Sequence, residues 1–329
     1  MRELGIGIVG CGSMGRSLAN AAQAVGGRVI AGADPAEEAR AKFAEQFKVP
    51  ALASVEQLLG NDRVHAVMVA SPNYLHSQHT LAAARAGRHV FCEKPMALRV
   101  ADCDRMIAEC EKAGVKLMVG QVLRYLPDLW RVLQIVHAGE MGKPHAAAIE
   151  RLWGTEGQIW RIPWRAQKEL SGGWLYEVNV HEVDYLCQLL GEPRQAYGVT
   201  AKFIQSHHDI EDFAVATFRF EGGRVGVLQG GSCSPLGRYE VAVFCEGGDL
   251  FLDRSTGVIR HRKAGGEVKE EPTSESNVEP PVQREVREFV EAVREGKPVT
   301  IPGQDGRRAI AMIEAAYRSA ASGEPVNLE

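Results

Sequence analysis

A glycine-rich hexapeptide near the N-terminus has the spacing of a phosphate-binding turn. Gly10-Cys11-Gly12-Ser13-Met14-Gly15 follows an apolar run and precedes a helical stretch. In such a turn the first glycine makes the bend, the second lets the backbone approach a pyrophosphate, and the third lets the helix pack on the strand. Free N–H groups and the helix dipole then bind the phosphate charge. We expect this turn to hold a dinucleotide through Gly10, Gly12, Ser13, Met14 and Gly15.

An acidic residue follows the second apolar run of the chain. Asp34 lies 19 residues after Gly15, and a carboxylate at this place accepts hydrogen bonds from the ribose hydroxyls of a dinucleotide. The same charge repels the 2′-phosphate of NADP. The next four residues, Pro35 to Glu38, include no lysine or arginine. We therefore predict NAD as the cofactor, in preference to NADP.

A second set of polar side chains lies in the helical stretch Trp174–Leu190. With about 100° per residue, Glu177, His181, Asp184 and Gln188 fall within roughly 60° of arc. Such a stripe is typical of a solvated face. It also suits proton transfer, since the unperturbed pKa of histidine is about 6.5. The residues alone leave both interpretations open.

Two further polar segments follow apolar runs of the first half. Ser71-Pro72-Asn73, with His76 shortly after, follows one run, and Glu93-Lys94-Pro95 follows the next. Open α/β sheets bind ligands at the carboxyl edge of their strands, where both segments would lie. The Lys94–Pro95 bond is a candidate for a cis peptide. His76 and His79 have no cysteine or carboxylate cluster nearby, so we expect no metal site.

The elements that must position these residues change in character along the chain. Through residue 121, short apolar strands alternate with helices of about 10–15 residues, which predicts βαβ units and a parallel sheet. The expected strands are Leu4–Val9, Arg28–Ala33, His65–Ala70, His89–Cys92 and Val115–Val119. The expected helices are Ser13–Val25, Ala36–Phe47, Tyr74–Ala86 and Val100–Ala113. This pattern indicates a Rossmann domain over residues 1–121.

Residues 122–329 have a different pattern, which predicts an α+β domain with a large, mostly antiparallel sheet. Period-two runs cover Arg194–Gln205, Asp212–Phe220, Arg224–Ser232 and Arg238–Cys245. Glycine pairs after Glu221 and Glu246 predict tight hairpin turns. The charged stretch Lys263–Glu275 is expected to be a solvated loop. The remaining expected helices are Pro127–His137, Trp174–Leu190, Val282–Val293 and a closing helix over about 305–321 that could pack back on the first domain.

Composition excludes several classes of protein. A chain of 329 residues corresponds to about two domains. The net charge of −4 argues against a nucleic-acid partner, and the chain has no apolar run long enough to span a membrane. Seven cysteines without a C-x-x-C pair indicate reduced thiols, so we expect a cytoplasmic protein.

In this order, the motifs resemble those of the Gfo/Idh/MocA family of NAD(P)-dependent oxidoreductases. The resemblance extends over nearly the whole chain. It rests on the glycine turn, the segments S-P-N-Y-L-H and E-K-P, the segment G-Q-V-L-R-Y-L-P, the segment G-G-W-L-Y-E-V-N-V-H-E-V-D, and the closing D-G-x-x-A-I-x-M-I-E-A-A-Y. It implies a Rossmann domain followed by an α/β domain with a large, mostly antiparallel sheet, and an assembly of two or four copies.

The resemblance also implies roles for residues of the first domain. Ser71, Asn73, His76 and Glu93 are expected to border the cofactor. The lysine of E-K-P, Lys94, is expected beside both the nicotinamide and the reacting carbon. An ammonium there can hydrogen-bond a substrate hydroxyl and stabilise the developing alkoxide.

In the second domain the resemblance assigns the general base to His181, with Glu177 one turn before it to assist. Many family members have aspartate where this chain has Glu177 and glycine where it has Asn179. The remaining residues expected to bind substrate are Arg124, Tyr125, Trp164, Arg165 and Asn179, together with His181 itself, and Trp160 adds an aromatic side chain before the glycine pair. Aromatic and arginine side chains suit the apolar face and the hydroxyls of a sugar.

The reaction implied is oxidation of a secondary alcohol in a polyol, inositol, sugar or sugar derivative, with hydride transfer to the nicotinamide of NAD. Two alternatives stay open. One is an NAD-dependent glycosidase that oxidises its substrate transiently and retains the cofactor. The other is a non-catalytic ligand sensor on the same fold, although such proteins commonly lose the lysine or the histidine, and both are present here.

Overall fold

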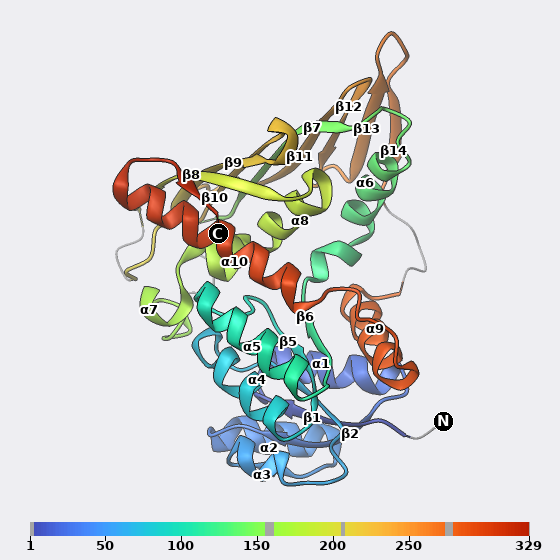
Figure 1. Ribbon diagram of the computed structural model, residues 1–329, viewed down its shortest axis with the longest axis vertical. Coiled ribbons are helices and arrows are strands. Elements are labelled where there is room, and N and C mark those ends of the chain that lie inside the picture. The colour runs from blue at the N-terminus through green and yellow to red at the C-terminus, as the bar shows by residue number, and fades with distance from the viewer. Residues whose placement is uncertain (1–2, 155–160, 205–207, 274–278, 329) are drawn as a thin grey trace. The chain divides into compact units, whose positions relative to one another are not determined.

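The computed structural model describes residues 3–154, 161–204, 208–273 and 279–328. The chain divides into two compact units (Figure 1). The first consists of Met1–Val122 and Glu279–Arg307, and the second of Leu123–Val278 and Arg308–Glu329. This division adds residues 279–307 to the segment expected to form the first domain.

Within the described residues, the first unit contains a six-stranded sheet in which every strand pair is parallel. Its order is β3-β2-β1-β4-β5-β6. The strands are β1 (Gly5–Val9), β2 (Arg28–Ala33), β3 (Ala51–Leu52), β4 (Ala66–Val69), β5 (His89–Cys92) and β6 (Leu117–Val119). The predicted Rossmann fold is confirmed, and the structure adds the short edge strand β3.

Helices connect these strands. They are α1 (Ser13–Ala24), α2 (Glu37–Phe47), α3 (Val55–Leu59), α4 (His76–Arg85) and α5 (Val100–Lys112), with a 3₁₀ turn at Asn73–Leu75. Helix α9 (Pro281–Glu295) packs against α1, although the two lie far apart in the sequence (Figure 1). Its buried Phe289 meets Phe91 of β5 edge to face, with ring centroids 5.7 Å apart. This apolar contact explains why residues 279–307 belong to the first unit.

Within its described part, the second unit contains a nine-stranded sheet of order β14-β13-β12-β11-β7-β10-β9-β8-β15. All its pairs are antiparallel except β7 with β10. The strands are β7 (Pro144–Leu152), β8 (Pro193–Ala201), β9 (Phe213–Phe220), β10 (Val225–Gly231), β11 (Arg238–Cys245), β12 (Gly248–Asp253), β13 (Val258–Lys263), β14 (Lys269–Pro272) and β15 (Val326–Asn327). The expected mostly antiparallel sheet is confirmed.

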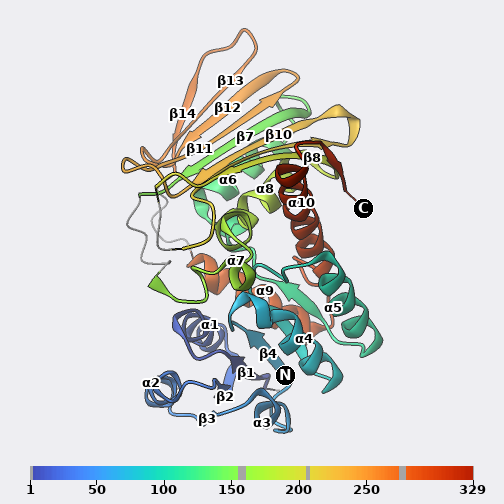
Figure 2. The same cartoon turned by 90° about the vertical axis from the view of Figure 1, so that its left-hand side faces the viewer.

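One face of this sheet forms the core of the unit. Val241, Ile149, Leu228 and Ala216 lie in register on β11, β7, β10 and β9, and all four are buried. Helices α6 (Pro127–His137), α8 (Val180–Leu190) and the greater part of α10 (Gly303–Ser322) lie along this face (Figure 2). Since successive side chains of a strand point to opposite faces, the neighbouring positions form the other face.

The structure corrects two of the predicted elements. The charged stretch from Lys263 is part of a hairpin, because Lys269–Pro272 pairs as β14 with β13 and forms an edge of the sheet. Lysine and glutamate on an edge strand discourage pairing with another chain, so a charged composition does not exclude a strand here. The expected single helix Trp174–Leu190 is also interrupted, since Leu175–Asn179 is a π-helix and α8 begins at Val180.

The predicted hairpin turns are confirmed. The glycine pairs after Glu221 and Glu246 join antiparallel strands, β9 to β10 and β11 to β12. No helix in the described ranges is both long and apolar enough to cross a membrane.

Candidate functional site

The glycine turn has the backbone geometry expected of a dinucleotide cradle. Gly10 has a φ of +93° and donates its N–H to the carbonyl of Ala33 at 2.8 Å. A Cβ on Gly15 would lie 1.8 Å from the carbonyl oxygen of Gly10, so only glycine allows this approach of α1. A Cβ on Gly12 would meet no atom within 4 Å. The open space at Gly12, directly before the exposed N-terminus of α1, fits a bound pyrophosphate.

Asp34 lies beside this turn at the end of β2. Its carboxylate accepts two backbone hydrogen bonds, from Cys11 to Oδ2 and from Ala36 to Oδ1, each at 2.8 Å. The structure also brings Arg40 of α2 to the same strand end, where its Nη1 donates to the carbonyls of Asp34 at 2.9 Å and Pro35 at 2.7 Å. Arg40 is not among the four residues that directly follow Asp34 in the sequence. The first turns of α2 bring Arg40 back toward them.

Cys11, inside the turn, is not a reactive thiol. Burial raises the pKa of Cys11 to about 12, and the nearby Asp34 carboxylate acts in the same direction. The protonated thiol therefore serves as a small buried filler.

The S-P-N-Y-L-H segment follows β4 and contains a network of hydrogen bonds. Asn73 is 5% exposed and lies in the 3₁₀ turn, and His76 is the first residue of α4. The Nε2 atom of His76 lies 2.8 Å from the carbonyl oxygen of Ser71, and its Nδ1 lies 2.7 Å from that of Pro95. Ser71 Oγ lies 2.9 Å from Nδ1 of His79. His76 therefore joins the segment after β4 to the one after β5.

The E-K-P segment follows β5, and its Lys94–Pro95 bond is cis, as expected. The backbone N–H of Lys94 donates to Glu93 Oε2 at 3.2 Å. Glu93 is 9% exposed. The backbone around Lys94 is thus fixed on both sides, by Glu93 and by the contact of His76 with Pro95.

In the second unit, the segment before His181 departs from the geometry expected of it. Glu177 and Asn179 lie in the π-helix, whereas His181 lies in α8. A π-helical turn has more residues than an α-turn, so the assumed 100° per residue does not hold before Val180. The stripe is also not a solvated face, because Glu177, His181 and Asp184 are only 2%, 8% and 2% exposed. Single-turn π-helical segments are frequent at functional sites.

Glu177 pairs with a residue outside its own helix. Arg165 Nε lies 3.0 Å from Glu177 Oε1, and the guanidinium of Arg165 lies over the ring of Trp164, 5.0 Å from its centroid. Two predicted substrate residues are therefore adjacent to the predicted catalytic carboxylate. Trp160 lies outside the described residues.

Arg124 is a buried structural partner in this structure. Its Nε and Nη2 donate to Oδ2 and Oδ1 of Asp184 at 2.7 and 2.5 Å. The neighbouring Tyr125 is 4% exposed. These contacts occupy the planar edge that Arg124 would offer to a substrate.

Asn179 is fully buried and faces away from solvent. Its Nδ2 donates to Glu182 Oε2 at 2.9 Å, and Glu182 in turn accepts from Arg151 Nη1 and Tyr239 Oη, each at 2.7 Å. A Cβ on Gly230 of β10 would lie 2.0 Å from Asn179 Oδ1, so the amide requires glycine on that strand. None of Glu182, Arg151 and Tyr239 was predicted from the sequence. Arg151 and Tyr239 lie on β7 and β11, and alternation along a strand does not show which polar residue faces inward; Glu182 lies on α8, outside the polar stripe of Glu177, His181 and Asp184.

A second network fixes the start of the π-helix and was also missed. Glu211 Oε1 accepts the backbone N–H of Trp174 at 2.9 Å, and Tyr317 Oη accepts that of Leu175 at 3.1 Å. The Tyr317 hydroxyl donates to Glu211. Burial, together with the Glu211 charge, raises the pKa of Tyr317 well above its usual value. The phenol therefore stays protonated and remains a donor.

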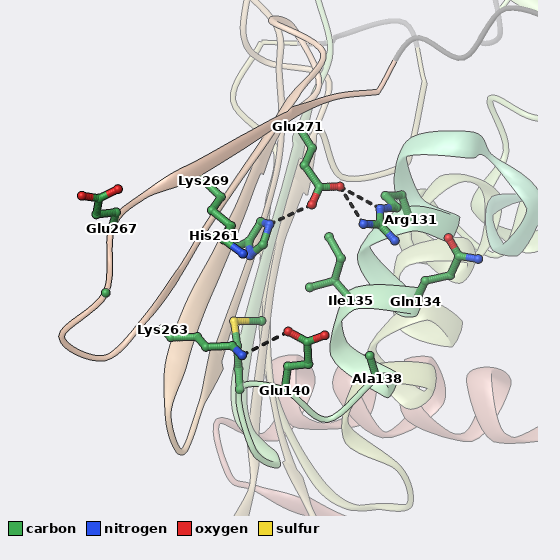
Figure 3. Close-up of a pocket in the computed structure, with 12 residues that line it drawn as sticks. Arg131, Gln134, Ile135, Ala138, Glu140, His261, Lys263, Glu267, Lys269 and Glu271 are labelled. Carbon is green, nitrogen blue, oxygen red and sulfur yellow. Dashed lines mark hydrogen bonds and ion pairs between the residues drawn. The ribbon is translucent and has the colours of Figure 1, made fainter.

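The structure also contains a cavity of about 350 Å³ that no predicted site residue lines. It lies between α6 and the β13–β14 hairpin (Figure 3). Glu271 stands between Arg131 and His261, with nitrogen–oxygen distances of 2.8 and 2.9 Å. Lys263 and Glu140 form another pair at 3.1 Å. Through Glu271, the β13–β14 hairpin is joined to Arg131 of α6.

In the part of the chain that the structure describes, no group of three or more histidine, cysteine, aspartate or glutamate side chains is placed to hold a metal ion.

Comparisons with known proteins identify the chain's relatives. Myo-inositol 2-dehydrogenase of Thermotoga maritima is 28% identical over 340 residues, which cover 98% of each protein. The 2,7-anhydro-N-acetylneuraminate hydratase of Mediterraneibacter gnavus is 33% identical over 258 residues, which cover 77% of this chain and 68% of that protein. The crystal structure of an aldose-aldose oxidoreductase from Caulobacter crescentus, complexed with glycerol, superposes with a TM-score of 0.87 at 27% identity and covers 99% of this chain and 100% of that one.

Two family models match most of the chain. The model described as an oxidoreductase family with an NAD-binding Rossmann fold matches residues 4–121. The model described as the C-terminal alpha/beta domain of the same oxidoreductase family matches residues 134–328. Together with the parallel six-stranded sheet and the mostly antiparallel nine-stranded sheet, these matches show that the chain belongs to the Gfo/Idh/MocA family of oxidoreductases.

Proposed function

We propose that this protein is an NAD-dependent dehydrogenase that oxidises a secondary alcohol of a polyol, inositol, sugar or sugar derivative. The observation that carries the proposal is the fixed position of Lys94 at the carboxyl edge of the NAD-binding sheet. Glu93 and His76 hold the backbone on either side of it. The relative named myo-inositol 2-dehydrogenase, matched over 98% of its length, supports the substrate class.

The residues of the first unit fit the cofactor. We propose that the turn Gly10–Gly15, including Ser13 and Met14, holds the pyrophosphate, and that Ser71, Asn73, His76 and Glu93 border the cofactor. Asp34 would receive the ribose hydroxyls and disfavour a 2′-phosphate. When bound, NAD supplies the hydride acceptor at C4 of its nicotinamide.

The protein's own side chains would handle the proton and the oxygen. Lys94 donates a hydrogen bond to the substrate oxygen and stabilises the alkoxide character that develops there. His181 accepts the hydroxyl proton as general base. The Glu177 carboxylate assists His181. Arg165, whose Nε lies 3.0 Å from Glu177 Oε1, balances the charge of that carboxylate.

Substrate recognition is proposed for the group around Trp164 and Arg165. The indole of Trp164 offers an apolar surface that matches the C–H face of a sugar. The guanidinium of Arg165, stacked on it, offers several N–H donors to the sugar hydroxyls. Tyr125, Asn179 and Arg124 are proposed to shape this pocket. Arg124 does so through Asp184, because its guanidinium is already paired there.

A screen of polyols, inositols and sugars with NAD tests this function. Reduction of NAD is followed by the absorbance of NADH, and the screen is repeated with NADP. A substrate oxidised by the wild-type protein and by neither Lys94→Met nor His181→Asn supports the proposal. Turnover at the wild-type rate in both variants contradicts the site assignment.

A second function is favoured by the relative named 2,7-anhydro-N-acetylneuraminate hydratase, which is 33% identical. The chain could use its cofactor for transient oxidation, followed by elimination or addition and then re-reduction, as an NAD-dependent glycosidase does. Purified protein would then contain stoichiometric NAD and convert a glycoside or anhydro-sugar without net release of NADH. Accumulation of NADH in step with product would contradict this second function.

We also propose that two copies associate through the face of the nine-stranded sheet opposite α6, α8 and α10 (Figure 2). Phe251, Ala242, Ala148, Val227 and Thr217 are in register across five strands on this face. Each is at least partly exposed. An apolar hollow lies over β11–β13, and such patches mark interaction surfaces. Light scattering on the wild-type protein and on Val227→Glu tests this. A dimer or tetramer that dissociates in the variant is expected, and a monomeric wild type contradicts it.

A further inference from the structure

His76 makes an unusual pair of contacts for a buried histidine. Its side chain is at the start of α4 and only 1% exposed. Both ring nitrogens face backbone carbonyl oxygens. Nδ1 lies 2.7 Å from that of Pro95, and Nε2 lies 2.8 Å from that of Ser71.

A carbonyl oxygen can only accept a hydrogen bond, so each contact requires an N–H on the ring. A neutral imidazole has one N–H, and its other nitrogen is an acceptor. A neutral ring would therefore place a lone pair against one of these oxygens at hydrogen-bond distance. The imidazolium form, with a proton on each nitrogen, satisfies both contacts with charge-assisted bonds.

We propose that His76 is a positioning residue that works as a cationic, doubly donating clamp. By holding the carbonyls of Ser71 and Pro95 it fixes the turn that presents Lys94. This inference rests on the proposed dehydrogenase function for its catalytic consequence. Its structural part, the protonation of His76 and the placement of Lys94, does not depend on that function.

The other groups around the ring fit this assignment. Burial lowers the pKa of His79 to about 4, and a charge on His76 acts in the same direction. The neutral His79 faces Ser71 Oγ through Nδ1 at 2.9 Å. Glu93 lies in the same turn as Lys94, with Oε2 directed to the Lys94 N–H at 3.2 Å. The segment thus combines one cationic histidine, one neutral histidine and one carboxylate.

Two hydrogen bonds therefore hold the backbone on either side of Lys94. On its N-terminal side, its own N–H donates to Glu93, and on its C-terminal side the Pro95 carbonyl accepts from His76. Loss of the second contact would free the Pro95–Met96 peptide, one residue beyond Lys94. A shift of about 1 Å in a reacting group can cost on the order of a hundredfold in rate.

The protonation state can be measured without a substrate. In the wild-type protein with ¹⁵N-labelled histidine, NMR spectra at neutral pH should show protons on both ring nitrogens of His76. His79 is the internal control and should show one protonated nitrogen. His76→Asn assigns the signals. A neutral single tautomer at His76 would overturn the proposal.

Two variants separate the contacts, because each amide reproduces one ring nitrogen. The nitrogen of His76→Asn occupies the place of Nδ1 and can still donate to Pro95. That of His76→Gln occupies the place of Nε2 and can still donate to Ser71. His79→Asn serves as the matched control in the neighbouring turn.

The readouts are the acetylation rate of the Lys94 amine, followed by mass spectrometry, and kcat with a substrate from the screen. We expect His76→Gln to lower kcat by about 10–100-fold and His76→Asn to retain most of the wild-type kcat. The Lys94 acetylation rate should change in His76→Gln and stay within twofold in His79→Asn. Equal effects of the two His76 variants on kcat and on acetylation would refute the clamp. Absence of any dehydrogenase activity would count against the proposed function and leave the NMR and acetylation tests decisive.

Discussion

The guanidinium of Arg124 donates two parallel hydrogen bonds to the carboxylate of Asp184, Nε to Oδ2 at 2.7 Å and Nη2 to Oδ1 at 2.5 Å. Other buried carboxylates of the same helical segment also pair with arginines. Glu177 pairs with Arg165 and Glu182 with Arg151. Each carboxylate is at most 2% exposed. Charges this deeply buried require a partner, so the arginines make it possible for this segment to be both acidic and internal.

Removing one partner of the Arg124–Asp184 pair should strongly destabilise the folded protein. We expect Arg124→Met to lower the free energy of unfolding by about 3–5 kcal/mol, because it leaves a carboxylate buried without its charge partner. Asp184→Leu should have a similar effect, because it leaves the Arg124 guanidinium buried without this carboxylate. Urea unfolding followed by circular dichroism measures both.

The double variant provides the control for that prediction. Arg124→Met combined with Asp184→Leu removes both charges and should recover most of the lost stability. Strictly additive losses would show that the two side chains do not act as a pair.

Sequence patterns predicted the arrangement of both units because it follows from local rules. Alternating apolar strands and helices indicate a parallel sheet, and period-two runs with glycine turns indicate an antiparallel one. The positions of Gly10, Gly15 and Asp34 relative to the turn follow from the same spacing. In the case of helix α9, the sequence predicts the helix but contains no signal for its packing on α1.

The geometry of the candidate site in the second unit could not be predicted in the same way. Its π-helix depends on contacts made by Glu211 and Tyr317, which come from distant parts of the chain. The partners of Glu177 and Asp184 are likewise arginines outside their helix. A stripe of carboxylates on a helix has the same sequence pattern whether water or arginine faces it.

Asp34 is predicted to control the choice of cofactor. Asp34→Ser should raise kcat/KM with NADP relative to NAD by at least about tenfold, because removal of a like charge relieves several kcal/mol of repulsion. Arg40, which donates to the carbonyls of Asp34 and Pro35, is placed to attract a 2′-phosphate. Steady-state kinetics with both cofactors measure the ratio.

Arg40→Met in the Asp34→Ser background is the matched control for this prediction. It should cancel most of the gain with NADP and leave the activity with NAD almost unchanged. Better use of NADP than NAD by the wild-type protein would contradict the role of Asp34.

Lys94 and His181 are predicted to act in the chemical step rather than in cofactor binding. Lys94→Met and His181→Asn should each lower kcat by about 10²–10⁴-fold, the range expected when a positioned acid, base or donor is lost. NADH binding, measured by its fluorescence, should change little in either variant. Loss of NADH binding together with activity would place the residue in the cofactor site instead.

His79 makes the stability of the protein sensitive to acid. Burial lowers the pKa of His79 to about 4 in the folded chain, whereas an exposed histidine has a pKa of about 6.5. Between these values the unfolded chain binds a proton that the folded chain does not. The contribution of neutral, buried His79 to the stability of the folded chain is therefore fully present above about pH 6.5 and is lost as the pH falls toward 4.

His79→Asn keeps a donor nitrogen beside Ser71 and removes the titration. The variant should lose less stability than the wild type between about pH 7 and about pH 4.5, as measured by urea unfolding at several pH values. Burial also lowers the pKa of His89, but His89 is present in both proteins, so the difference between their slopes isolates His79. Identical slopes would mean that His79 is protonated as readily in the folded chain as in the unfolded one. In that case the His79 ring that contacts Ser71 Oγ would be cationic rather than neutral.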